Sequence, residues 1–338
     1  MGGDRPKKPI TGPFGIVGGG VIGSGWAARA LSRGYAVVAH DPADGAESRM
    51  RTAVDRAWPA ITQMGLYPGA DPTAITFVGS PEEVGEVAGF VQEAAPEVLD
   101  VKQAVLRQIS EGATPTTMIA SSTSGLLPSE LQRAMRHPER LVVGHPFNPV
   151  YLLPLVELVG GEQTVLSSLT AAEEVYRDLD MKVLRVRNEI EGFLSDRLQE
   201  ALWREILHLV ADDVANTSEL DDAIVYGPGL RWAIMGTNLT FHLAGGEQGM
   251  RHMFEQFGPA LEWPWTKLVA PPLTNELIDR MVDGTQRQAD GRSIAELERI
   301  RDEALVSIMQ ALEKADVAAG EIAKRRRHRT MAASSFDR

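Results

Sequence analysis

The sequence predicts an α/β protein in which a doubly wound, mainly parallel sheet is followed by an all-helical C-terminal domain. Three observations support this fold class. An apolar strand runs into a glycine-rich turn near the N-terminus, strand and helix patterns alternate to about residue 188, and only helical patterns follow. A chain of 338 residues is long for one core and comfortable for two domains.

The chain opens with a strand, a glycine turn and a helix. Residues 14–17 (FGIV) are an apolar run that leads directly into the G-x-G-x-x-G pattern of residues 18–23. Residues 24–33 have a helical composition and end at a glycine, and a second apolar run at 36–40 closes on Asp41. A strand, glycine turn, helix, strand and acid within about thirty residues are typical of a dinucleotide-binding Rossmann unit.

Each part of this unit has a physical role toward a dinucleotide. The glycines permit the tight turn, the approach of the backbone to a pyrophosphate and close helix packing, and the helix N-terminus offers unpaired N–H groups. Asp41 can accept hydrogen bonds from the adenosine ribose and repels a 2′-phosphate, which favours NAD over NADP. Glycines that only pack a turn are the alternative. The predicted cofactor contacts are Gly18, Gly20, Val21, Ile22, Gly23, Asp41 and Glu93.

Further apolar runs at the spacing of β–α units complete the predicted sheet. They are residues 75–78, 89–92, 118–121, 141–144, 155–159 and 183–186, with helices that include 97–109 and 128–135 between them. In such sheets ligands bind outside the carboxyl ends of the strands. Gly18, Glu93, residues 121–124 and His145 all fall at such ends.

A histidine and a carboxylate flank the proline-rich stretch after residue 144. His145 ends one apolar run, and Glu157 lies in the next run, twelve positions later. If the two runs are strands folded back around the turn, these side chains face each other. A carboxylate behind a histidine holds the imidazole in one tautomer and raises its basicity.

These residues suit the oxidation of an alcohol by a nicotinamide cofactor. The reaction needs a base for the hydroxyl proton and hydrogen-bonding groups for the oxygen. His145 is the predicted base and Glu157 its partner, while Ser124 and Asn148 are the predicted contacts to the carbinol oxygen. A structural histidine, a loop serine and a turn asparagine are the alternatives.

The pattern changes after residue 188, where helical segments begin. Residues 191–215 carry an apolar stripe long enough for a core and a dimer interface, which predicts a homodimer. We expect residues 1–188 to be an NAD-binding domain that carries the His–Glu pair, 189–323 a helical substrate and dimerisation domain, and 324–338 a disordered basic tail. Further predicted helices are residues 219–224, 249–257, 275–284 and 294–313.

Bulk properties narrow the function. A formal charge of -12 argues against a nucleic-acid binder. The chain has no cysteine, so disulfides, thiolate metal ligands and cysteine nucleophiles are excluded, and no metal site is predicted. No signal peptide and no membrane-spanning apolar stretch are visible, so a cytoplasmic location is expected.

The motifs GGGVIGSGWA, ASSTSGL and HPFNPVYLLPLVELVGG together resemble the 3-hydroxyacyl-CoA dehydrogenase superfamily, over about residues 14 to 320. The resemblance implies a Rossmann domain, a helical C-terminal domain and catalytic roles for Ser124, His145 and Glu157. Within the superfamily the chain most resembles the L-carnitine dehydrogenases, through SSTSGLLPSE, EALWREILHLV and GLRWAIMGT. That closer resemblance implies NAD-linked oxidation of L-carnitine to 3-dehydrocarnitine.

Departures from the acyl-CoA members are informative. Asp196 stands where those enzymes have an asparagine, and no lysine occurs between Lys8 and Lys102, which implies a weak CoA site. Carnitine carries a trimethylammonium group, which proteins bind with aromatic faces and a carboxylate. Each aromatic residue can equally belong to the core. The predicted substrate contacts are Phe147, Tyr151, Phe193, Trp232 and Phe257, with Asp196 as the counter-charge.

Two other functions stay open at this point. The same scaffold could oxidise L-gulonate or a 3-hydroxyacyl-CoA instead of carnitine. A non-catalytic NAD(H)-binding protein, such as the related lambda-crystallins, is a further alternative. Such a protein needs only the glycine turn and Asp41, so the presence of Ser124, His145, Asn148 and Glu157 argues against it. The residues do not indicate which group binds the substrate carboxylate, although Arg231 and Lys182 could do so.

Overall fold

The computed structural model describes residues 8–233, 235–245, 249–267, 272, 274–277, 279 and 289–334. The chain divides into two compact units, one formed by the residues up to Leu194 with the segment from Ile322, and the other by Ser195–Glu321. Among the described residues, no helix is long and apolar enough to cross a membrane. Nor do the same residues include three or more histidine, aspartate or glutamate side chains grouped to hold a metal ion.

An eight-stranded sheet forms the core of the first unit, in the order β3-β2-β1-β4-β5-β6-β7-β8. Neighbouring strands are parallel except β6 and β7, which form an antiparallel hairpin. The predicted mainly parallel, doubly wound sheet is therefore confirmed. The strands are β1 (Phe14–Val17), β2 (Val37–His40), β3 (Ile75–Phe77), β4 (Phe90–Glu93), β5 (Met118–Ser121), β6 (Leu141–Pro146), β7 (Leu155–Gly160) and β8 (Lys182–Arg185).

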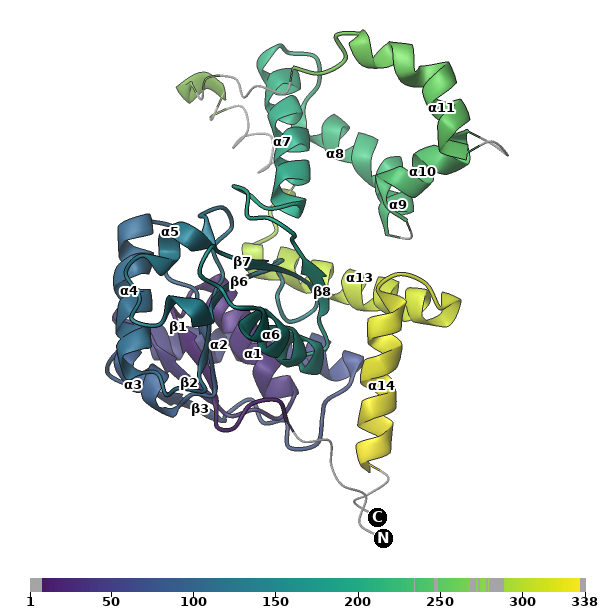
Figure 1. The fold of residues 1–338 in the computed structure, drawn as a ribbon. Coiled ribbons are helices and arrows are strands. Elements are labelled where there is room, and N and C mark those ends of the chain that lie inside the picture. Colours follow the sequence, from purple (N-terminus) through teal and green to yellow (C-terminus); the bar gives the residue numbers. More distant parts are fainter. Residues whose placement is uncertain are drawn as a thin grey trace. The chain divides into compact units, whose positions relative to one another are not determined.

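Helices cover both faces of the sheet (Figure 1). One apolar cluster joins the sheet to α1 (Val21–Ser32), α2 (Ala46–Met64) and α6 (Leu166–Asp178). A second cluster joins its other face to α3 (Pro81–Val87), α4 (Leu99–Gly112) and α5 (Pro128–Gln132), and a 3-10 turn, η1 (Pro138–Arg140), precedes β6. The central strands β1, β4, β5 and β6 are buried along their whole length, which explains why they read as continuous apolar runs.

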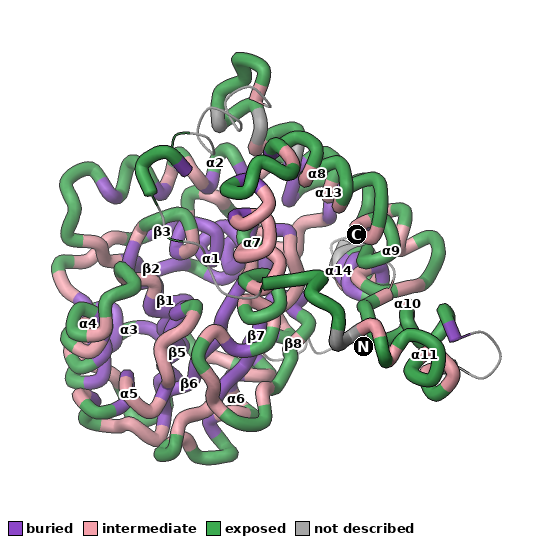
Figure 2. The backbone as a smooth tube through the Cα atoms, turned by 90° about the horizontal axis from the view of Figure 1, so that it is seen from above, coloured by how far each residue is buried: buried purple, intermediate pink, exposed green. Residues whose placement is uncertain are grey.

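The second unit is helical in its described residues, as the sequence predicts. Its helices are α7 (Ser195–Ala211), α8 (Thr217–Val225), α9 (Pro228–Trp232), α10 (Thr237–Ala244), α11 (Gly249–Phe257), η3 (Gly258–Glu262) and α13 (Ile294–Ala315). Most of the predicted helix at residues 275–284 lies outside the described residues. Figure 2 shows that buried residues gather in the sheet and α1, whereas α8 to α11 are mostly exposed.

The C-terminal basic run forms a helix, so the prediction of a disordered tail is wrong for residues up to Ser334. These residues belong to α14 (Gly320–Ser334). Arg326 is 5% exposed, and its guanidinium donates to the carbonyl of Gly65 at 2.7 Å and to Ser32 Oγ at 3.2 Å. Arg329 lies 3.3 Å from Asp180. Arg326 and Arg329 are therefore bound to acceptors of the first unit, which a pattern of consecutive arginines does not reveal.

Candidate active site

The glycine turn between β1 and α1 leaves room for a ligand at the start of the helix. Gly18 has a φ of +104°, and a Cβ on Gly23 would lie 1.9 Å from the Gly18 carbonyl oxygen. A Cβ on Gly20 would meet no protein atom within 4 Å, so packing within the protein does not require a glycine there. Gly20 is the N-cap of α1 and supplies no side-chain cap to its N–H groups. These features fit a bound pyrophosphate.

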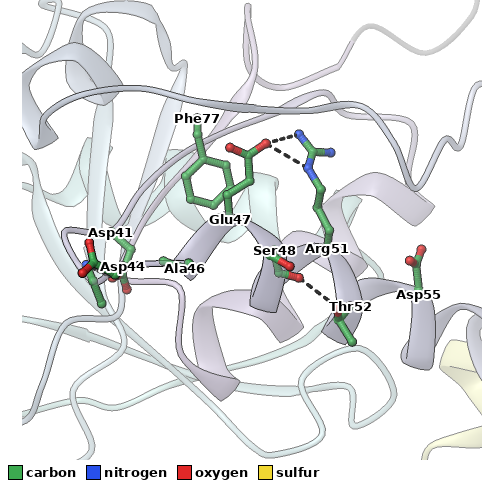
Figure 3. Close-up of a pocket in the computed structure, with 11 residues that line it drawn as sticks. Asp41, Asp44, Ala46, Glu47, Ser48, Arg51, Thr52, Asp55 and Phe77 are labelled. Carbon is green, nitrogen blue, oxygen red and sulfur yellow. Dashed lines mark hydrogen bonds and ion pairs between the residues drawn. The ribbon is translucent and has the colours of Figure 1, made fainter.

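Asp41 follows β2 and lies beside the glycine turn. Its Oδ2 accepts a hydrogen bond from the backbone N–H of Gly19 at 2.6 Å, and its Oδ1 accepts one from Ala43 at 2.8 Å. Each carboxylate oxygen can accept more than one hydrogen bond, so lone pairs remain for ribose hydroxyls. Asp41 also lines an open pocket of about 680 Å³ between the end of β2 and the first turns of α2 (Figure 3).

Acidic side chains dominate this pocket. The acids that line it are Asp41, Asp44, Glu47 and Asp55. Among the lining residues, Arg51 is the one basic side chain, and Figure 3 shows it paired with Glu47, at 2.8 Å. Arg51 also donates to the backbone carbonyl of Ile75 at 2.8 Å. A negative lining disfavours a 2′-phosphate beside the ribose, which fits NAD better than NADP.

His145 and Glu157 lie directly opposite each other in the β6–β7 hairpin, as their spacing predicts. The distance from His145 Nδ1 to Glu157 Oε2 is 3.0 Å, and the two residues are 4% and 0% exposed. Glu157 Oε1 accepts a hydrogen bond from the Leu194 backbone N–H at 3.1 Å. Because an ionised carboxylate can only accept hydrogen bonds, a neutral imidazole beside an ionised Glu157 would carry its proton on Nδ1 and its lone pair on Nε2.

Aromatic residues pack around the imidazole. The Phe147 ring centroid lies 4.9 Å from that of His145, and the Phe193 centroid lies at 5.7 Å. Phe193 is completely buried and belongs to the apolar cluster beneath the hairpin, so in this structure it supports the imidazole and is not exposed to a ligand. Phe147 and Tyr151 are half-buried and Asn148 is exposed, all in the loop between β6 and β7.

Ser124 lies just beyond β5, and a carboxylate that the sequence analysis did not select fixes its backbone. Glu97 Oε1 accepts hydrogen bonds from the Ser124 N–H at 2.9 Å, the Gly125 N–H at 3.3 Å and the Thr123 hydroxyl. Partial burial opposes ionisation, but the Thr123 hydrogen bond, Lys102 and the Ser124 N–H together hold the pKa of Glu97 below its usual value. The available signal for Glu97 in the sequence was its place as a second acid, four residues after Glu93 at the end of β4.

Glu93, predicted to contact the cofactor, is completely buried at the end of β4. Its carboxylate accepts hydrogen bonds from Lys102 at 3.0 Å, Ser121 at 2.5 Å and the Ala95 N–H at 2.6 Å. Burial raises the pKa of Glu93, against the opposing effect of Lys102 and these hydrogen bonds. The buried pair of Glu93 and Lys102 joins β4 to α4, and Glu97 carries the exposed carboxylate at this edge.

The strand register brings the predicted residues of the first unit to one edge. Val17 pairs with Glu93, and Glu93 with Ser121, so β1, β4 and β5 end at the same level. The remaining predicted substrate contacts belong to the second unit. Asp196 is half-buried in the first turn of α7, Trp232 is 43% exposed at the end of α9, and Phe257 is 51% exposed at the end of α11.

Family models and known proteins match nearly the whole chain. A model described as "3-hydroxyacyl-CoA dehydrogenase, NAD binding domain" matches residues 14–190, and one described as "3-hydroxyacyl-CoA dehydrogenase, C-terminal domain" matches residues 192–288. An L-carnitine dehydrogenase from a Pseudomonas species is 58% identical over 299 residues, which are 88% of this chain and 93% of the relative. That of Pseudomonas putida strain KT2440 is 56% identical over 91% of this chain and 96% of the relative.

A solved structure supports the same relationship. The crystal structure of 5-formyl-3-hydroxy-2-methylpyridine 4-carboxylic acid 5-dehydrogenase, an NAD⁺-dependent dismutase, superposes with a TM-score of 0.75 at 25% identity. The match covers 90% of this chain and 99% of that one. The predicted resemblance to the L-carnitine dehydrogenases is thus confirmed, and the protein is an NAD-dependent dehydrogenase. The chain belongs to the 3-hydroxyacyl-CoA dehydrogenase family.

Proposed function

We propose that this enzyme oxidises the 3-hydroxyl of L-carnitine to 3-dehydrocarnitine with NAD. The observation that carries the proposed chemistry is the buried His145–Glu157 pair, at 3.0 Å, in a hairpin next to the carboxyl edge of the sheet. The choice of carnitine is supported by the names of relatives that are 58% and 56% identical. Because a base and an orienting acid are both present, catalysis is favoured over a role restricted to NAD binding.

Each proposed site residue has one role in the reaction. His145 Nε2 takes the proton of the 3-hydroxyl, while Glu157 holds the Nδ1 proton and stabilises the imidazolium that forms. Ser124 and Asn148 hydrogen-bond the carbinol oxygen. NAD, when bound by the glycine turn and Asp41, supplies the acceptor for the hydride from C3. The hydroxyl proton and the hydride thus leave the substrate to different acceptors.

Aromatic residues and one acid are the proposed contacts of the trimethylammonium group. Phe147 and Tyr151 keep part of their surface exposed in the loop after the base, and Trp232 and Phe257 are exposed on the helical unit. Asp196 is the proposed counter-charge. Since Phe193 is completely buried, its proposed contribution is to pack against His145 and support it.

An assay of NADH formation at 340 nm tests the proposed substrate. L-carnitine, L-gulonate and 3-hydroxybutyryl-CoA are compared at alkaline pH, each with NAD and with NADP. We expect turnover with L-carnitine and a clear preference for NAD, because Asp41 and its acidic neighbours disfavour the 2′-phosphate. Turnover of either other substrate in the absence of activity on carnitine would overturn the assignment.

Asp196→Asn is expected to raise the KM for L-carnitine about five-fold, because a partly exposed charge pair contributes up to about 1 kcal/mol. The KM for NAD should stay the same, since the proposed cofactor contacts belong to other segments. Glu200→Gln is the matched control. Glu200 lies one turn later on α7, is exposed and pairs with Arg204 at 3.1 Å, so its loss should leave both KM values unchanged. Equal KM values for the two variants would rule out the counter-charge role.

We also propose that the enzyme is a homodimer formed through the helical unit. Large apolar side chains on this unit are exposed, far more than isolated surface residues would explain. They include Leu198 (76%), Tyr226 (76%), Leu230 (66%), Leu239 (60%), Leu243 (63%) and Trp265 (66%). Light scattering coupled to gel filtration should give twice the chain mass of 36.8 kDa at micromolar concentration. A mass of one chain under these conditions would contradict the proposal.

A further inference from the structure

We infer that Arg29, on the helix that follows the glycine turn, positions the loop between His145 and Glu157. This inference rests on the proposed function, because it treats that loop as part of the active site. Arg29 is an unusual residue for its place. It lies in the last turn of α1 and is 2% exposed, although a charged side chain is seldom buried unless its hydrogen-bonding groups are matched.

The guanidinium of Arg29 holds two separate segments through backbone carbonyls. Its Nε donates to the carbonyl of Val150 at 2.6 Å, and its Nη2 donates to that of Leu153 at 3.0 Å. On its other edge, Nη1 donates to the carbonyls of Leu179 at 2.9 Å and Asp180 at 3.4 Å. Val150 and Leu153 belong to the loop that joins β6 to β7. One planar side chain therefore fastens this loop to α1 and to the turn before β8.

A second contact seats the same loop on the same helix. Gly25 lies one turn before Arg29 on α1, and a Cβ placed on it would lie only 2.9 Å from the Val150 Cβ. Gly25 thus lets the backbone of α1 approach the loop closely, and the long side chain of Arg29 binds the loop one turn later. Val150 is 1% exposed and Leu152 is 2% exposed, so the loop is tightly packed at this point.

The position of this contact connects the cofactor site to the catalytic hairpin. The N-terminal end of α1 is the proposed pyrophosphate site, and Arg29 lies about two turns further along the same rigid helix. The loop that it holds carries Asn148 and Tyr151 and begins two residues after His145. A change in the Arg29 contacts would therefore shift the proposed substrate contacts relative to the cofactor, without altering the glycine turn or Asp41.

The chemistry of the side chain explains why an arginine is used. Burial, and after it the nearby charge of Arg326, lowers the pKa of Arg29 to about 9, while Asp180 opposes the shift. The guanidinium is therefore charged at neutral pH, and its charge strengthens the hydrogen bonds to the carbonyls. A lysine keeps the charge but presents its three donors from a single atom, so it cannot span carbonyls on two sides of a planar fork.

Arg29→Lys is the test, with Arg33→Lys as the matched control. Arg33 lies one turn later, at the C-cap of α1, and is equally buried, at 2% exposed, but its contacts are with Asp178, Asp180 and the Tyr67 ring. We expect Arg29→Lys to lower kcat about thirty-fold, because small displacements of reacting groups cost up to about a hundred-fold. The Kd for NADH should change less than about two-fold, within the scatter of single-site effects.

The control separates positioning from general stability. Arg33→Lys should lower the Tm about as much as Arg29→Lys while leaving kcat within about two-fold, because it breaks comparable buried contacts that lie away from the hairpin loop. An unchanged kcat in Arg29→Lys, or an equal loss of kcat in both variants, would overturn the inference. If Arg29→Lys does not fold, the kcat of Gly25→Ala tests the inference instead. This substitution adds one methyl group against Val150 and should lower kcat about ten-fold, whereas a normal kcat would reject the inference.

Amide hydrogen exchange gives a readout that does not depend on the substrate. Residues 147–154 should exchange at least about ten-fold faster in Arg29→Lys than in the unmodified enzyme, and at the normal rate in Arg33→Lys. Equal exchange in the two variants would count against the inference even if carnitine is the substrate. If carnitine is not the substrate, faster exchange in Arg29→Lys alone would still support it, so the two failures are distinguishable.

Discussion

Replacement of His145 by glutamine is expected to lower kcat about a thousand-fold with L-carnitine and NAD, within the range typical of a lost general base. Glutamine keeps a polar side chain of similar size opposite Glu157 but cannot take the hydroxyl proton. Stopped-flow or steady-state measurement of NADH formation at saturating substrate gives kcat.

Binding of the cofactor provides the control for His145→Gln. NADH fluorescence titration should give an unchanged Kd, since the proposed cofactor contacts, the glycine turn and Asp41, belong to other segments of the chain. Glu157→Gln is the companion variant. The new amide would keep the hydrogen bond from Leu194 and turn its NH₂ group toward Nδ1, which favours the tautomer with the proton on Nε2. We expect kcat to fall about a hundred-fold for this reason. Normal turnover in either variant would rule out the proposal that His145 is the general base and Glu157 its partner.

Lys102→Met is expected to lower the free energy of unfolding by about 3–5 kcal/mol and the Tm by about 10 °C. Lys102 is 1% exposed, and its ammonium lies 3.0 Å from Glu93 and 3.3 Å from Glu97. Removing it leaves Glu93 buried without its cationic partner, although the hydrogen bonds from Ser121 and Ala95 remain. Thermal unfolding followed by circular dichroism measures the loss.

The pH dependence of this loss has a definite sign. Burial already raises the pKa of Glu93 in the folded enzyme, and removing Lys102 raises it further. Below the ordinary glutamate pKa of 4.5, Glu93 is neutral in both the folded and the unfolded variant, so the deficit is smallest there. Between 4.5 and the folded pKa of the unmodified enzyme, the unfolded chain ionises and both proteins lose stability together. The deficit grows as the pH rises from that folded pKa to the higher folded pKa of the variant, because Glu93 is then ionised in the folded unmodified enzyme and still neutral in the folded variant. A deficit that shrinks between pH 5 and 7 would contradict this account.

Two further variants make the comparison specific. The double variant Lys102→Met, Glu93→Gln should recover more than half of the lost stability, because it removes the buried charge together with its partner. Lys182→Met changes an exposed lysine at the edge of the sheet and should cost less than about 0.5 kcal/mol. If all three variants lost the same stability, the buried pair would have no special role.

Local patterns were sufficient for most of the fold. The strands of the sheet coincide with the apolar runs, most clearly in the central strands, because strands buried on both faces have a continuous apolar sequence. The opposition of His145 and Glu157 was expected if the two apolar runs are strands folded back around the proline-rich turn, and the antiparallel register of β6 and β7 confirms it. The glycine turn was predictable for a similar reason, because its three glycines have different local requirements within one short segment.

The sequence did not reveal the contacts of three buried charged residues, two of which have partners more than a hundred residues away along the chain. Glu93 is a plausible cofactor ligand at a strand end, and only its burial against Lys102 shows that its carboxylate is already used. Arg29 reads as an ordinary polar position in a helix, whereas its partners lie more than a hundred residues later. Arg326 reads as part of a solvated tail until Ser32 and Gly65 are seen to accept its hydrogen bonds.

The sequence by itself determined the fold class, the cofactor turn and the pairing of His145 with Glu157, because each depends on periodicity or spacing within a short segment. The tertiary structure alone decided which charged groups are buried and what they contact: Lys102 against Glu93, Arg29 on the loop between β6 and β7, and Arg326 of the last helix against Ser32 and Gly65. Burial of a charge depends on which acceptors the folded chain brings around it, and that is a property of the packed structure.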